Sequence, residues 1–248
     1  MSSVTDVATP DGERAGWKTL LALCRVSNLP TVWMNVLTAV VLSGADVSPG
    51  VVVLLMASLS AFYCAGMSLN DVCDHAADAE SQPFRPIPAG RISLTGARVV
   101  TGVLFVAGFG LLACAPERTA FGPAVVLLAL IVGYDVLHKA HAATVVLMAA
   151  TRLMVFVVAA WAVAGTASAV VIAAGVLQFG YTLLVTVVAR YENTRGRRYP
   201  FPVIPRMIAA MALVDGGVLT LWVSPWWLVP GLGAALLTHI GQRYVRGD

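Results

Sequence analysis

The sequence predicts an all-α membrane protein, a polytopic helical bundle of about eight transmembrane helices. Three observations support this fold class. Hydrophobic residues make up 58% of the 248 residues and charged residues only 12%, whereas a soluble domain carries about 25% charged residues. The mean hydropathy is +0.82. Long stretches such as 99–115 and 166–189 contain no charged residue at all.

Eight apolar runs approach the length of about 20 residues that is needed to cross the hydrocarbon core. They cover 29–46, 50–69, 95–115, 119–137, 142–164, 166–189, 203–222 and 225–242. Lipid-exposed backbone must satisfy its own hydrogen bonds, and these runs are too long and too continuously apolar for barrel strands, so we expect helices. Residues 1–28 form a separate N-terminal segment, in which 14–25 predicts an interfacial amphipathic helix, and 29–248 form the transmembrane domain.

The basic residues predict the orientation of these spans. Thirteen of the sixteen lysines and arginines fall at the N-terminus, in the loops after the second, fourth and sixth spans, or at the C-terminus. The opposite side carries only Arg118. By the positive-inside rule, both termini and these three loops are cytoplasmic in a multi-pass membrane protein.

The composition also excludes several classes of protein. A disordered chain or a nucleic-acid-binding domain needs more charge, and a disulfide scaffold needs a cysteine framework. The four cysteines form no CxxC pair, so we expect them to be reduced and packed. We expect a lipid bilayer as surroundings, no nucleic acid, and infer no protein partner.

Carboxylates concentrate where the second apolar run ends, in Asn70-Asp71-x-x-Asp74-x-x-x-Asp78. If the helix continues, the three aspartates lie at i, i+3 and i+7 and face one side. The three carboxylates repel one another unless a cation lies between them. Mg²⁺ with carboxylate, water and phosphate ligands is the obvious candidate. Arg85 and Arg91 follow closely and add fixed positive charges. Together these residues predict a diphosphate site at the membrane surface; the alternative is a solvated acidic loop.

These motifs resemble the UbiA superfamily of intramembrane prenyltransferases. The aspartate motif, followed by Arg85-Pro-Ile-Pro-x-Gly90-Arg91, looks like the family's first aspartate-rich motif, and Arg25-Val-Ser-Asn28-Leu-Pro-Thr31 looks like its opening. Tyr134-Asp135-x-x-x-Lys139 resembles the family's Tyr/Lys motif, with the lysine five positions after the tyrosine instead of the commoner four. The resemblance implies a bundle around a central cavity, in which Mg²⁺ and two aspartate motifs hold an isoprenyl diphosphate.

The second motif of that family is where this chain departs. The matching stretch is Arg190-Tyr-Glu192-Asn193-Thr-Arg195-Gly196-Arg197, in which arginines replace expected carboxylates. A second full Mg²⁺ site is therefore doubtful. The arginines could hold diphosphate oxygens directly, because the guanidinium fork suits phosphate, could mark an impaired site, or could serve only as topology signals.

The predicted site residues take four roles. We expect Asp71, Asp74 and Asp78 to bind Mg²⁺ and act in catalysis together with Lys139 and Glu192. The residues that we expect to bind the diphosphate are Asn70, Arg85, Tyr134, Asn193, Arg197 and Arg198. Asn35 and Arg152 are predicted to line the cavity, and for Arg152 a substrate-facing role and a structural ion pair stay equally open. We expect Asp215 to be a satisfied interhelical contact and the histidines to be solvated.

The sequence thus predicts an Mg²⁺-dependent enzyme that ionises an isoprenyl diphosphate. Capture of the cation by a lipophilic acceptor, which we expect to be aromatic, makes it a prenyltransferase, with proton loss to Glu192 or Asp135. Capture by a double bond of the substrate itself makes it a terpene cyclase, the serious alternative. A transporter that uses the acids as a cation site is disfavoured, because the acids lie at a helix end and no inverted repeat is visible.

Overall fold

The computed structural model describes residues 16–138, 141–195 and 202–245, without the side chains of 142 and 193–195. Nine α-helices and four short 3₁₀ turns make up this part of the chain, which holds no strand, so the predicted all-α class is confirmed. The elements are α1 (Trp17–Leu23), η1 (Val26–Asn28), α2 (Leu29–Ser43), α3 (Pro49–Ser81), α4 (Leu94–Leu112), η2 (Arg118–Ala120), α5 (Phe121–Leu137), η3 (Ala142–Thr144), α6 (Val145–Ala164), α7 (Ala169–Arg195), α8 (Val203–Trp222), η4 (Pro225–Trp227) and α9 (Leu228–Tyr244).

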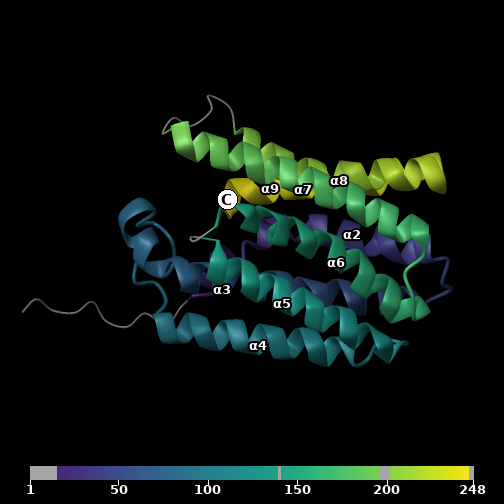
Figure 1. The fold of residues 1–248 in the computed structure, drawn as a ribbon, viewed down its shortest axis with the longest axis horizontal. Helices are drawn as coiled ribbons and strands as arrows, with labels where there is room; N and C mark the ends of the chain where they lie inside the picture. Colours follow the sequence, from purple (N-terminus) through teal and green to yellow (C-terminus); the bar gives the residue numbers. More distant parts are fainter. Residues whose placement is uncertain (1–15, 139–140, 196–201, 246–248) are drawn as a thin grey trace, which may run out of the picture.

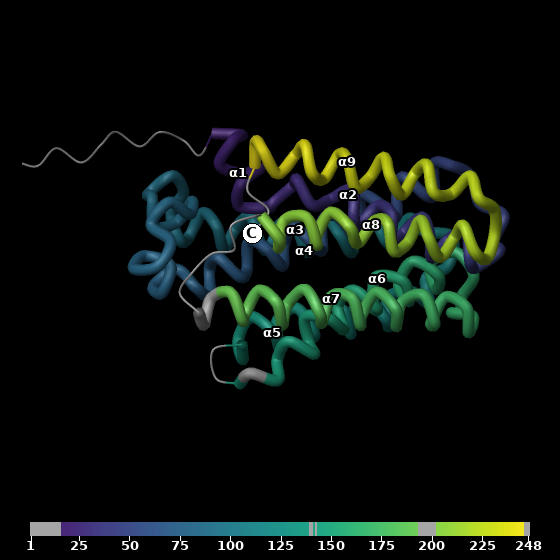
Figure 2. Tube along the Cα trace, turned by 90° about the horizontal axis from the view of Figure 1, so that it is seen from above, coloured from purple at the N-terminus to yellow at the C-terminus, as the bar shows by residue number. Residues whose placement is uncertain are grey.

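The helices from α2 to α9 run up and down along one common direction (Figures 1 and 2). α3, α5, α7 and α9 finish at the end of the bundle from which α2, α4, α6 and α8 start. We call this the polar end, because the aspartate motif and the loop 82–93 lie there. The last turns of α3 and the loop 82–93 project beyond the neighbouring helices (Figures 1 and 2).

Local sequence signals explain where several helices begin and end. Gly44 and Gly165 follow α2 and α6 in left-handed conformations, with φ of 65° and 68°, which only glycine adopts without cost. Pro49 opens α3, where its missing N–H has no helical partner to lose. Ser93 caps α4 by accepting a hydrogen bond from the backbone N–H of Gly96 at 3.0 Å.

Seven helical segments of the described chain are long and apolar enough to cross a membrane. They correspond to the first seven predicted runs. The eighth run, 225–242, forms η4 and the helix α9 (Leu228–Tyr244) and is not among these seven. The second half of α9 carries the polar residues Thr238, His239 and Gln242, which lower the hydropathy of this run. α9 packs against α8 and α2 and so completes the bundle.

α2 is the central helix of the bundle and contacts α3, α6, α8 and α9. Its buried residues Val32 and Val36 join Phe62 of α3 and Phe156 of α6 in the main hydrophobic core. α4 lies at the edge of the bundle (Figure 1), and its Val103 and Val106 are exposed. In a membrane such apolar side chains face lipid, so their exposure carries no penalty.

Two glycines bring α8 and α9 into unusually close contact. A Cβ on Gly231 would lie 2.9 Å from Gly216 Cα and 3.0 Å from Ala212 O. Both neighbours are backbone atoms that cannot move aside, so only a residue without a side chain fits. Small residues at helix crossings are a common way to pack membrane helices, and here they fix the position of α8.

Candidate active site

α3 carries the aspartate motif out of the apolar part of the bundle. Its 33 residues extend for about 50 Å, whereas the hydrocarbon core is about 30 Å thick. The helix continues without a break to Ser81, as the i, i+3, i+7 spacing required. The last third of α3, from Asp71 onward, therefore lies at the boundary between hydrocarbon and water.

The three aspartates on this part of α3 divide into two directions. Asp71 and Asp78 are almost two helical turns apart and face the same way, whereas Asp74 falls about 60° short of one turn after Asp71. Asp71 and Asp78 are only 3% and 4% exposed, so each needs a partner to remain charged. The three acids therefore do not share one set of contacts, in contrast to our expectation from the spacing.

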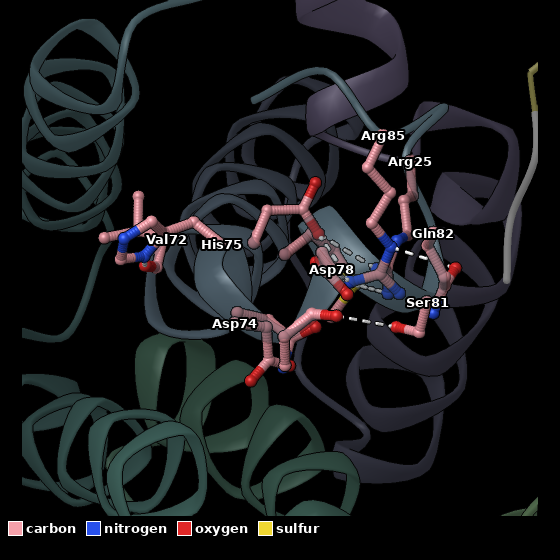
Figure 3. A network of polar contacts seen from close by, with 12 residues as sticks. Arg25, Val72, Asp74, His75, Asp78, Ser81, Gln82 and Arg85 are labelled. Atoms are coloured by element: carbon pink, nitrogen blue, oxygen red, sulfur yellow. Dashed lines mark hydrogen bonds and ion pairs between the residues drawn. The ribbon is translucent and has the colours of Figure 1, made fainter. Parts of the chain in front are cut away.

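Arg25, Asp71, Asp78 and Arg85 form what we call the acid–arginine cluster. Arg85 Nη1 donates to Asp78 Oδ2 at 2.7 Å and to Asp71 Oδ1 at 3.3 Å. Arg25 Nη2 donates to the same Asp71 oxygen at 3.1 Å. Gln82 orients Arg85 by accepting from its Nε at 3.1 Å. Arg25, Arg85 and Asp78 converge at the end of α3, whereas His75 lies on the opposite side (Figure 3).

Arg25 reaches the cluster from a strained turn between α1 and η1. Its φ of 44° places a non-glycine residue in the left-handed region, which costs of order 1–3 kcal/mol. Contacts to one face of α3 hold this turn: Arg25 Nη1 lies 3.5 Å from Met67 Sδ, and Asn28 Nδ2 donates to the Tyr63 hydroxyl at 3.1 Å. The opening motif that contains Arg25 and Asn28 thus positions a guanidinium against Asp71.

Asn70 and Asp74 face α5 instead, and we call their contacts the α3–α5 bridge. Asn70 Nδ2 donates to Asp135 Oδ1 at 3.2 Å, and Asp74 Oδ1 lies 3.1 Å from His138 Nε2. The His138 ring stacks on Tyr134 at 5.3 Å. We expected His138 to be solvated, but it contacts one of the motif aspartates. Sequence spacing could not reveal this, because it does not tell which helix end faces which.

Arg91 does not join the acid–arginine cluster. It is exposed, and its Nη2 donates to the backbone oxygen of Phe84 at 2.5 Å, so it braces the loop 82–93. Of the two arginines that follow the motif, only Arg85 contacts its aspartates, contrary to our expectation.

The end of α7 carries the stretch that departs from the family pattern. Arg190 lies on the last turns of α7 and is half-buried. Glu192 lies on the last turns of α7 and is half-buried. The other predicted residues of this region, Lys139, Arg197 and Arg198 and the side chain of Asn193, lie outside the described part of the structure.

A second polar group, which we call the interior chain, links α6, α2 and α8 inside the bundle. Arg152 Nη1 donates to Asn35 Oδ1 at 2.9 Å, and Asn35 Nδ2 donates to Asp215 Oδ2 at 2.6 Å. The Arg152 guanidinium also lies over the Tyr63 ring, 5.6 Å from its centroid. Asp215 is thus a satisfied interhelical contact, as predicted.

Within residues 16–138, 141–195 and 202–245, no three His, Cys, Asp or Glu side chains gather closely enough to hold a metal ion on their own. The motif aspartates contact arginines and a histidine instead. A metal that takes only one or two carboxylates and completes its shell with phosphate and water, as Mg²⁺ does, still matches the oxygen donors present.

Comparison with known proteins places this arrangement in a family. The sequence model of the UbiA prenyltransferase family matches residues 28–246, which is most of the chain. The protein belongs to the UbiA prenyltransferase family. The resemblance inferred from the aspartate motif is therefore confirmed.

Several curated proteins that this chain resembles are named digeranylgeranylglyceryl phosphate synthase. That of Methanothrix thermoacetophila is 36% identical over 91 residues, which is 36% of this chain and 34% of the relative. That of Methanopyrus kandleri is 35% identical over 92 residues, or 37% and 33%, and that of Methanoculleus marisnigri is 48% identical over 59 residues, or 23% and 21%. The aligned segments thus span about a third of these relatives or less.

A solved structure concerning digeranylgeranylglyceryl phosphate synthase has the same fold. It superimposes with a TM-score of 0.59 at 17% identity, over 92% of this chain and 95% of that one. The two folds therefore correspond over nearly the whole chain.

Proposed function

We propose that the protein is a prenyltransferase that moves an isoprenyl group from its diphosphate to a lipophilic acceptor. The acid–arginine cluster carries this proposal, because it gathers buried carboxylates and guanidinium groups where an apolar bundle meets water. A prenyl diphosphate has the matching chemistry, an anionic head and a hydrocarbon tail. Membership of the UbiA family supports the assignment.

The diphosphate is bound in this proposal by the guanidinium groups of Arg25 and Arg85. Arginine donates paired N–H groups in a geometry that suits phosphate oxygens. Both arginines already lie against Asp71, so the carboxylate holds them in position before the substrate arrives. Tyr134 is a further candidate at the same end of the bundle, and Asn70 supports the motif from α3. Lys139, Asn193, Arg197 and Arg198 remain candidates from the sequence.

Mg²⁺ is the proposed metal, held by one or two of Asp71, Asp74 and Asp78. When bound, it would neutralise charge on the diphosphate. One full site of this kind fits the residues present, because the stretch 190–197 offers arginines where further carboxylates would be needed.

The reaction breaks the bond between C1 of the prenyl chain and the diphosphate oxygen. Positive charge develops on C1 while Arg25 and Arg85 stabilise the departing diphosphate, and the apolar bundle excludes water from the cation. An acceptor hydroxyl then attacks C1, a C–O bond forms, and the hydroxyl proton passes to a carboxylate, for which Glu192 and Asp135 are the candidates.

The acceptor that we now favour is a glyceryl phosphate lipid and not the aromatic compound expected from the sequence. The curated relatives are named for digeranylgeranylglyceryl phosphate, a prenylated glyceryl phosphate. Transfer to the hydroxyl of such a lipid needs the same bond changes at C1. We propose further that residues 29–248 form one catalytic domain preceded by the segment 1–28, and that the polar end and both termini face the cytoplasm, because the basic residues concentrate there.

The test is to incubate the purified protein with Mg²⁺ and geranyl, farnesyl or geranylgeranyl diphosphate, first without and then with a glyceryl phosphate acceptor. Diphosphate release and a prenylated lipid that both depend on the acceptor would support transfer. A cyclic hydrocarbon formed without acceptor, and absent in Asp71→Asn, would make the protein a terpene cyclase and overturn the proposal.

A further inference from the structure

The interior chain separates an arginine from an aspartate by one asparagine. The amide of Asn35 is fixed from both sides, since its nitrogen donates to Asp215 and its oxygen accepts from Arg152. No direct ion pair joins Arg152 to Asp215 among the described residues. An arrangement made only to neutralise two buried charges would place them in contact, because a direct pair recovers more of the cost of burial.

The two ends of the interior chain differ in burial. Asp215 and Asn35 are 1% and 0% exposed, so the acid is closed off in the helix packing. Arg152 of α6 keeps a small accessible surface, and its guanidinium lies between Asn35 of α2 and Tyr63 of α3. A guanidinium carries five N–H donors, and the described contacts use one of them, on Asn35, while the Tyr63 ring covers one face. No other hydrogen bond of this guanidinium is found within the described residues, so it keeps N–H donors that a ligand could use.

The depth of Arg152 relates it to the acid–arginine cluster. It is seven residues into α6 from the polar end, or about 10 Å, and Asn35 is six residues into α2, or about 9 Å. Tyr63 lies eight residues before Asp71 on α3, about 12 Å deeper in the bundle. The reacting carbon of a prenyl diphosphate bound at the cluster would therefore lie between two cationic positions.

We propose that Arg152, oriented by Asn35 and Tyr63, binds the anionic head group of the acceptor. This inference rests on the proposed transferase function and adds the chemical class of its second substrate. Arginines at membrane depth are costly and usually mark a pathway or ligand site, and a guanidinium pairs with phosphate or carboxylate through two parallel hydrogen bonds. A glyceryl phosphate and an aromatic carboxylic acid share this anionic group.

The test compares Arg152→Gln with the double variant Arg152→Gln/Asp215→Asn. The single variant leaves the Asp215 carboxylate buried beside a neutral side chain, so misfolding could mimic lost function. The double variant removes both charges. If Arg152 only neutralises Asp215, the double variant recovers wild-type acceptor binding. If Arg152 binds the acceptor, the double variant folds and remains defective.

Two binding measurements separate the substrates. We expect both variants to bind a non-reactive prenyl thiodiphosphate within twofold of the wild type, and to bind a geranylgeranylglyceryl phosphate acceptor at least tenfold more weakly. The same lipid without its phosphate should bind wild type and variants alike. Asp215→Asn alone should keep acceptor affinity, because Asn35 can still donate to the new amide oxygen.

Comparing a glyceryl phosphate with a hydroxybenzoate identifies which class of anionic acceptor Arg152 binds. Arg152-dependent binding of the glyceryl phosphate, or of a hydroxybenzoate in its place, supports the proposal and names the acceptor class. Recovery in the double variant, an equal loss for the phosphate-free lipid, or no Arg152-dependent binding of either anion overturns it. If the wild type transfers no prenyl group but binds the anionic lipid through Arg152, the transferase proposal fails while the anion site stands.

Discussion

The protein brings arginines and aspartates together twice, and the two regions differ in how the charges meet. In the acid–arginine cluster, Asp71 accepts directly from two guanidinium groups at the edge of the membrane. In the interior chain, Asn35 stands between Arg152 and Asp215. At the edge, water can solvate a carboxylate when its arginine turns to a phosphate, so the pairs can be exchanged. In the interior no water replaces a lost partner, so the acid must stay bound.

The largest effect should come from Asp71→Asn. The change removes the carboxylate that holds Arg25 and Arg85 in place, together with a proposed metal ligand. We expect diphosphate release to fall at least a hundredfold, the order lost when one group that stabilises transition-state charge is removed. Asp46→Asn is the matched control, since Asp46 is exposed between α2 and α3 at the opposite end of the bundle. Activity within threefold of wild type in Asp71→Asn would remove the cluster from the active site.

Arg85→Lys and Arg85→Gln should have the next largest effect. One guanidinium nitrogen of Arg85 contacts both Asp71 and Asp78, and a lysine cannot reproduce the planar fork. We expect KM for the prenyl diphosphate to rise about tenfold or more in both variants. Arg91→Gln is the control, because Arg91 braces the loop without contacting the acids. An equal loss in Arg91→Gln would mean that loop conformation, and not the charge of Arg85, is what matters.

Gly231→Val should separate the two regions. A side chain at Gly231 would meet the backbone of α8 at Gly216 and Ala212, and overpacking of this kind costs about 1–3 kcal/mol. Because α8 carries Asp215 and contributes nothing to the acid–arginine cluster, we expect a lower melting temperature and weaker acceptor binding with prenyl diphosphate binding retained. Gly233→Val on the same helix meets no atom within 4 Å, and its melting temperature should be close to that of the wild type.

His138→Gln should have the smallest effect. Glutamine can still donate a hydrogen bond to Asp74 but lacks the ring that stacks on Tyr134, so we expect a loss of about three- to tenfold in kcat/KM, the equivalent of one aromatic contact. His75→Gln is the control, because the His75 ring contacts its own helix at Val72 O. Matching losses in the two variants would show that His138 has no particular role beside Asp74.

Much of the fold could be predicted because the length and hydropathy of an apolar run identify a membrane helix. The span expected at 203–222 has the bounds of α8. The end of α3 could not be predicted from hydropathy alone, because hydropathy falls at Ser68 while the helix continues to Ser81. The run 225–242 is not among the seven apolar segments, because its helix carries Thr238, His239 and Gln242 among the apolar residues.

The candidate site was only partly predictable, because spacing along one helix does not tell which neighbour each face meets. Asp71, Asp74 and Asp78 were found from their pattern, but the division between Arg85 and His138 depends on how α5 lies against α3. Arg25 was recognised as part of an opening motif, and its left-handed turn toward Asp71 could not be read from residue types. Arg152 and Asn35 were predicted as interior polar residues, but the hydrogen bond from Asn35 to Asp215 joins positions 180 residues apart and could not be predicted from spacing.

The unbroken course of α3 from the apolar core into water also bears on how products would leave. A prenyl transfer yields one product that is entirely ionic and one that is mostly hydrocarbon. Because the aspartates lie on helical turns that project past the bundle, free diphosphate would be released straight into the aqueous phase. The prenylated lipid would stay in the bilayer, so the two products would separate by solubility. The reverse reaction would then be slow, because it needs both products at the same site.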